Sequence, residues 1–153
     1  HRQFPDAKFI NIVRNPLRVI PSSISLFSAH WKTYGDPETD YALQDTVIEH
    51  SKYWYRYPHR YLKRIPANQY VLVNYRNLVK DPQGTIERIY AQFGMEISPQ
   101  FAQILETETE KAKAFKSKHQ YSLQAMGLSR RRIFREFAHA RQQYNFEFSE
   151  ENN

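Results

Sequence analysis

Arg14 and Ser22 are the residues whose types and spacing best suit a chemical role. Arg14 directly follows a short apolar segment, residues 8–13, and directly precedes Asn15. A guanidinium group offers planar, paired N–H donors that fit a phosphate. Ser22 comes seven residues after Asn15, so on a helix its hydroxyl would lie on the same side, about 10 Å further along. The two side chains could therefore bracket one anion.

Two plainer interpretations stay open at this point. Arg14 could be an exposed arginine at the start of a helix, and Ser22 could be a small residue that tolerates a kink at Pro21.

The residues around Arg14 predict a strand followed by a helix. Residues 8–13 are β-branched and apolar, which is typical of a strand buried in a parallel sheet. Asn15 is a favoured helix N-cap, and Pro16 suits the first helical position. An apolar stripe then follows at helical spacing, with a kink expected at Pro21; its members are Leu17, Ile20, Ile24, Phe27 and Trp31.

A second strand is predicted at residues 69–74, after a long helix that stops before Pro66. The helical crossover between the strands favours parallel, right-handed pairing. Ligands bind at the carboxyl ends of such strands, and Tyr75 lies there, where its ring could face a purine. Alternatively, Tyr75 is an ordinary core or edge tyrosine.

One face of the long helix is predicted to carry Val47, Ser51, Trp54, Pro58, Tyr61 and Ile65.

The remainder of the chain is predicted to be helical. Helices are expected from Pro82 to Gly94, from Ser98 to about Phe115, and from an N-cap at Ser129 to Tyr144. The basic segment 116–121 is expected to be a loop, and residues 147–153 a flexible acidic tail. The predicted fold class is α/β: part of a three-layer fold with few parallel strands flanked by helices and a helix-rich C-terminal half.

Composition excludes several kinds of site. The chain has 153 residues, a net charge of +6 and no cysteine, which rules out disulfides, thiolate metal sites and cysteine nucleophiles. Its 41% apolar content predicts a folded core. The sequence shows neither a membrane span nor the layout of a signal peptide in residues 1–15. The lack of cysteine and of a membrane segment suits a cytoplasmic location, which is therefore expected. Lys118 and His119 could add positive charge to a polyanion site, or belong to a solvated loop.

Several segments resemble, in order, the sulfotransferases that use 3′-phosphoadenosine-5′-phosphosulfate (PAPS). Residues 4–16 with Ser22 resemble the family's 3′-phosphate-binding segment. Weaker similarity lies in the next strand and turn, the helix after it, and a carboxy-terminal pattern, at residues 70–82, 86–94, 119–123 and 127–129.

The resemblance implies a P-loop-like fold that transfers a sulfonate group from PAPS to a hydroxyl or amine, without a metal. Adenosine 3′,5′-bisphosphate (PAP) is the product, and the acceptor would be a small molecule or glycan. By the same resemblance, Arg14 and Ser22 would hold the 3′-phosphate, and Tyr75 would lie near the adenine. Lys118 and His119 would contact the nucleotide, although better-known members have Lys-Gly and a later Gly-Asp-Trp there. The family also usually has acidic residues after the tyrosine, where this chain has Arg76 and Asn77.

No segment matches the family's phosphosulfate-binding loop or supplies its catalytic base. We therefore expect residues 1–146 to be the C-terminal part of a single sulfotransferase domain. Because sulfonate transfer depends on positioned donors around the developing charge, we expect the chain alone to be inactive. Measurable PAPS-dependent turnover by the purified chain would contradict this expectation.

Two other function classes are compatible with the sequence. A basic nucleic-acid-binding module would explain the pI near 9.5, the cluster at residues 130–132 and the many tyrosines. It predicts salt-sensitive DNA binding without preference for PAP. A P-loop kinase remnant would not require a 3′-phosphate on the nucleotide.

Overall fold

The computed structural model describes residues 3–36, 38–115 and 121–146. The chain divides into two compact units, one of residues 1–14 and 60–118, the other of residues 15–59 and 119–153. The predicted loop at 116–121, except for Tyr121, and the predicted tail at 147–153 lie outside the described residues. No described helix is long and apolar enough to cross a bilayer.

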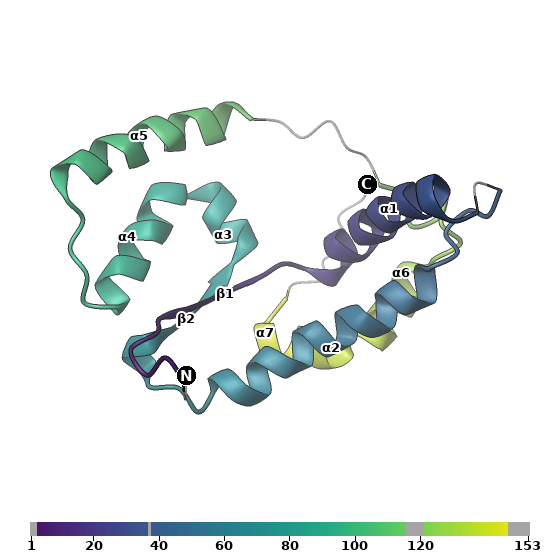
Figure 1. Cartoon of the computed structure of the whole chain (residues 1–153), viewed down its shortest axis with the longest axis horizontal. Helices are drawn as coiled ribbons and strands as arrows, with labels where there is room; N and C mark the ends of the chain where they lie inside the picture. Colours follow the sequence, from purple (N-terminus) through teal and green to yellow (C-terminus); the bar gives the residue numbers. More distant parts are fainter. Residues whose placement is uncertain (1–2, 37, 116–120, 147–153) are drawn as a thin grey trace. The chain divides into compact units, whose positions relative to one another are not determined.

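The first unit contains a parallel pair of strands, β1 (Phe9–Val13) and β2 (Tyr70–Asn74). Their register runs from Phe9 opposite Tyr70 to Val13 opposite Asn74, and the strands lie side by side in Figure 1. Both predicted strands and their parallel pairing are thereby confirmed, as is the α/β class. The shared register brings the two carboxyl ends to the same level.

Helices pack on β2 within this unit: η1 (Ala67–Gln69), α3 (Tyr75–Lys80) and α4 (Pro82–Gln92) contact the strand, and α5 (Pro99–Ala114) contacts α3 and α4. Val73, Ile89 and Phe93 form a buried cluster between strand and helix. Two side-chain bonds hold η1 in place: Lys8 Nζ donates to the carbonyl of Asn68, and Gln92 Nε2 to that of Ala67.

Local capping explains where these helices begin and end. Asp81 accepts a hydrogen bond from the N–H of Gly84, with Pro82 at the first helical position, as expected for the start of α4. Gly94 follows α4 with φ +65°, a conformation that glycine adopts without strain. Ser98 caps α5 through the N–H of Phe101.

Helix α3 was predicted only as the turn after a strand. Asn74 explains the helix, because its side chain accepts from the N–H of Arg76 at 2.9 Å. Asparagine at a strand end can thus act as the N-cap of the next helix.

The second unit is helical. It includes α1 (Pro16–Tyr34), most of α2 (Gln44–Leu62), α6 (Arg130–Glu136) and α7 (Ala138–Tyr144). Its most deeply buried side chains are Ile20, Ile24, Ile48, Ile133 and Phe137. Helix α1 continues through Pro21.

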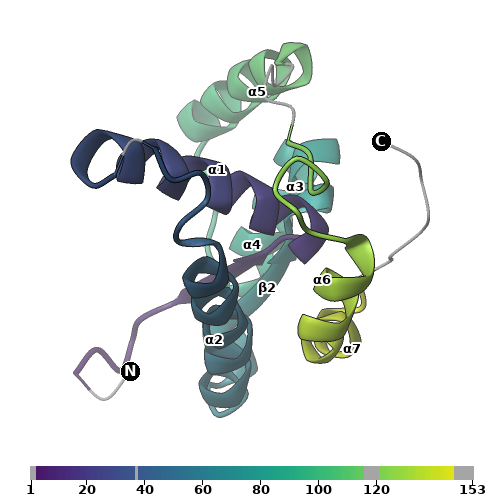
Figure 2. The same cartoon turned by 90° about the vertical axis from the view of Figure 1, so that its right-hand side faces the viewer.

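The predicted helix from Ser129 to Tyr144 is instead two short helices, which Figure 2 shows in succession. The division falls at Phe137, whose φ of −110° departs from helical geometry. Phe137 is fully buried against Tyr55 in an edge-to-face contact, with ring centroids 5.6 Å apart. The Ser129 cap is confirmed, since its Oγ accepts from the N–H of Arg132.

The predicted inward face of α2 was wrong in part. Val47, Ile48 and Tyr55 are its buried residues, whereas Trp54 and Tyr61 are 68% and 42% exposed. The inward face is rotated around the helix axis because Tyr55, the neighbour of Trp54, is the ring that packs on Phe137. On α1, Phe27 is likewise 48% exposed rather than buried.

An ion pair links α2 to α6. Lys52 Nζ lies 2.9 Å from Glu136 Oε2, with side chains only 16% and 24% exposed. The hydrogen bond from Lys52 holds the pKa of Glu136 below its ordinary value of 4.5. Lys52 also binds Glu49, and these two carboxylates raise its pKa.

Replacing Glu136 with Gln is expected to reduce the free energy of unfolding by about 1 kcal/mol at neutral pH. A lowered folded pKa stabilises the fold above the unfolded value. The difference between parent and variant should therefore be full above pH 4.5 and shrink as the pH falls through the lower folded pKa. Urea unfolding of parent and variant at intervals of about 1 pH unit, from about pH 3 to pH 7, measures this difference. A difference that is unchanged down to the lowest pH would contradict it.

Candidate functional site

Arg14 and Tyr75 come together at the carboxyl ends of the two strands. Each is the first residue after its strand, and the register Val13 opposite Asn74 makes the two neighbours. The Arg14 guanidinium carbon lies 4.6 Å from the centre of the Tyr75 ring. This is a cation–π contact, which holds a charged group over an aromatic face. The structure thus brings together two of the predicted site residues.

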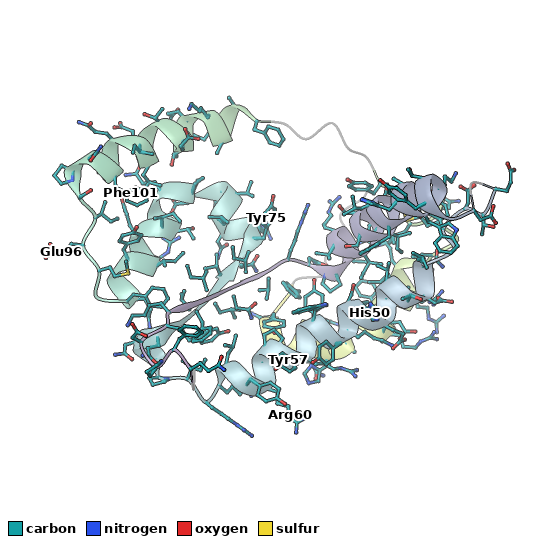
Figure 3. All side chains as sticks on the ribbon, viewed as in Figure 1. His50, Tyr57, Arg60, Tyr75, Glu96 and Phe101 are labelled. Carbon is teal, nitrogen blue, oxygen red and sulfur yellow. The ribbon has the colours of Figure 1, made fainter. Side chains whose placement is uncertain are left out.

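The position of Tyr75 is fixed from both sides along the chain. It follows β2 directly and is the first residue of α3, as Figure 3 labels it. Asn74, which caps α3, therefore also fixes the backbone position of Tyr75. Tyr75 is 37% exposed, so its ring is partly covered and partly accessible. A planar ligand group could still reach it.

Arg14 is exposed, and its guanidinium group is a cation with several N–H donors in one plane. The contact with the Tyr75 ring holds the guanidinium near the carboxyl ends of the two strands. The arrangement suits an anionic, bidentate group such as a phosphate. Within the described parts of the chain, no group of three or more His, Asp or Glu side chains could hold a metal ion.

Ser22 lies on α1 in the second unit, and its residue is partly buried. The predicted start of α1 is confirmed: Asn15 Oδ1 accepts from the N–H of Leu17 at 2.9 Å, and Pro16 is the first helical residue. The joint grip of Arg14 and Ser22 on one anion stays a prediction. The same holds for Lys118 and His119, which lie outside the described residues.

Sequence reasoning missed one contributor to this site. Asn74 was expected only as the end of a strand, yet its cap converts the following residues into α3. Its signal was present in the sequence, because an asparagine directly after an apolar strand is a helix N-cap candidate.

A sequence model described as the sulfotransferase family matches residues 1–99 of this chain. The matched region includes both strands, Arg14, Ser22 and Tyr75. It ends at the first residue of α5.

Two curated proteins are also similar to this chain. Both are omega-hydroxy-beta-dihydromenaquinone-9 sulfotransferases, one from Mycobacterium bovis and one from Mycobacterium tuberculosis. Each is 34% identical over 94 residues, which is 60% of this chain and 24% of the relative. The chain thus spans about a quarter of the length of these relatives. No solved structure gives a significant match.

Proposed function

This chain belongs to the sulfotransferase family, and on that premise we propose that it forms the 3′-phosphate and adenine side of a PAPS site. The whole protein would transfer the sulfonate group from PAPS to a hydroxyl or amine of an acceptor and release PAP. A hydroxyl acceptor is in keeping with the names of the mycobacterial relatives, which refer to an omega-hydroxy compound.

The stacked pair of Arg14 and Tyr75 carries this proposal. A 3′-phosphate is a compact dianion, and Arg14 offers it a charged, planar donor set at the carboxyl end of a parallel sheet. Ser22 would add a hydroxyl donor from α1. PAPS itself supplies the activated sulfonate group, while these residues bind and orient the nucleotide. Lys118 and His119 would lie on the same nucleotide.

The partly covered ring of Tyr75 fits a double role. One part of the ring lies under the Arg14 guanidinium, and the remaining accessible part would lie near the adenine. A ring in contact with both groups would match the spacing between the 3′-phosphate and the base, which the nucleotide itself determines.

The basis for a nucleic-acid-binding module is weaker. Of the three arginines at 130–132, Arg132 donates to the carboxylate of Asp45, so its charge is compensated within the second unit. A site built on that cluster would have less charge than the sequence suggests.

Calorimetric titration of the chain with PAP and with adenosine 5′-monophosphate tests the proposal. We expect PAP to bind at least about tenfold more tightly, because only PAP has the 3′-phosphate that Arg14 would contact. Equal affinities would overturn the assignment of the 3′-phosphate to this site. Stronger binding of an arbitrary DNA duplex, competed by salt but not by PAP, would favour the nucleic-acid alternative.

Replacing Tyr75 separates its ring from its hydroxyl. Tyr75→Phe keeps the aromatic face under Arg14 and is expected to change PAP affinity less than about threefold. Tyr75→Leu removes that face and is expected to weaken PAP binding by about tenfold, since the cation loses its support. The same titration measures both variants. Equal losses in the two variants would show that the hydroxyl, rather than the stacked ring, is what matters.

A further inference from the structure

Four aromatic side chains of helix α2 are exposed, and ring contacts join three of them, Tyr53, Trp54 and Tyr57, which we call the aromatic face. They are 56%, 68% and 42% exposed. The rings contact one another: Tyr53 meets Trp54 edge-on at 6.2 Å and lies 5.2 Å from Tyr57 between ring centres. These rings therefore form one continuous surface, and Figure 3 labels Tyr57 on this helix.

The aromatic face is separate from the core. The buried residues of α2 are Val47, Ile48 and Tyr55, on another side of the helix. Contiguous exposed apolar surface on a folded domain commonly marks an interaction site. The composition of the aromatic face is specific, because each of its three rings carries one polar group, a hydroxyl or an indole N–H. Tyrosine and tryptophan are the residues enriched where a membrane meets water.

The charges along α2 favour an anionic partner. Its two acidic residues both form ion pairs within the second unit, Asp45 with Arg132, and Glu49 with Lys52, which also pairs with Glu136. Arg56 is exposed, and in the sequence it lies between Trp54 and Tyr57. The helix thus presents aromatic rings and positive charge to solvent, with its carboxylates already in ion pairs.

We propose that the aromatic face of α2 binds the surface of a membrane that contains anionic lipids. The rings would enter the headgroup region, and Arg56 would face lipid phosphates. This binding is independent of the nucleotide site, so PAP titration and lipid binding can fail separately.

The chain has two tryptophans, Trp31 and Trp54, which allows a direct test. Trp31→Phe leaves Trp54 as the single reporter, and no hydrogen bond is lost because Trp31 Nε1 has none among the described residues. We expect the emission of Trp54 to shift to the blue with vesicles of phosphatidylcholine and phosphatidylglycerol in equal amounts. Lipids brominated in the upper acyl chain should quench it.

Variants in the same Trp31→Phe chain define the surface. Tyr53→Ser combined with Tyr57→Ser should weaken vesicle binding by about tenfold. Arg56→Gln should weaken it by about fivefold with anionic vesicles and leave the weak binding to pure phosphatidylcholine unchanged. Tyr34→Ser is the matched control, because Tyr34 is an exposed tyrosine on α1, 86% exposed, outside the aromatic face. Circular dichroism confirms that each variant folds.

Three results would overturn the proposal. In the first, vesicles leave the emission of Trp54 unchanged. In the second, Tyr34→Ser reduces vesicle binding as much as the double variant does. In the third, Trp54 emission shifts with protein concentration in the absence of lipid, and the double variant abolishes that shift. The aromatic face would then join two copies of the chain.

Discussion

Replacing Arg14 with Gln is expected to weaken PAP binding by about 100-fold, the largest effect on ligand binding in this chain. A charge-assisted hydrogen bond contributes about 1.5–3 kcal/mol, and a bidentate phosphate contact contains two such bonds. Glutamine has neither the charge nor the planar fork. Calorimetric titration with PAP measures the change directly.

Arg14→Lys refines this prediction. Lysine keeps the charge but loses both the fork and the flat surface that stacks on Tyr75 at 4.6 Å. We expect it to weaken PAP binding by about tenfold, between the parent and Arg14→Gln. Arg64→Gln is a matched control, since Arg64 is exposed and lies in the turn after α2, before the amino end of β2 and not after its carboxyl end.

The comparison with adenosine 5′-monophosphate decides whether Arg14 acts on the 3′-phosphate. Arg14→Gln should remove the preference for PAP and leave the affinity for the monophosphate almost unchanged. A variant that loses both affinities equally would place Arg14 on another part of the nucleotide. An unchanged PAP affinity would remove the basis of the proposed function.

Phe137→Ala is expected to have the largest effect on stability, a loss of about 3–5 kcal/mol. Phe137 is 1% exposed and lies at the division between α6 and α7, with its ring edge-on to Tyr55. Alanine would leave a cavity and remove the aromatic contact. Urea unfolding followed by circular dichroism measures the loss as a lower midpoint.

Two further variants keep this test interpretable. Phe137→Leu fills more of the site and should cost less, about 1–2 kcal/mol, so a measurable transition remains even if the alanine variant is unfolded. Phe115→Ala, at a residue that is 76% exposed, should change stability by less than about 0.5 kcal/mol. Similar losses at both phenylalanines would show that burial of Phe137 does not govern the stability of the chain.

The sequence predicted the strands and the start of α1 because their signals are local. Residues 8–13 and 69–74 are both short and largely apolar, and Asn15 with Pro16 satisfies the first turn of α1 directly. The parallel pairing followed from the crossover between them. Together these signals predicted that Arg14 and Tyr75 lie at the same rim.

Other features depend on contacts that no local pattern encodes. The spacing of Trp54 and Tyr61 fits an amphipathic helix, but which side of α2 faces inward is set by the packing of Tyr55 on Phe137. The division at Phe137 has the same origin, because a continuous helical pattern contains no Gly or Pro there. The stacking of Arg14 on Tyr75 required the register, which parallel pairing alone does not specify.

That register couples ligand recognition to the order of folding. Arg14 and Tyr75 are distant along the chain and become neighbours only when β1 and β2 align. Contacts between distant segments form slowly, because a long loop must close first. Affinity for a nucleotide would therefore emerge late during refolding, and a bound nucleotide would slow the separation of the two strands.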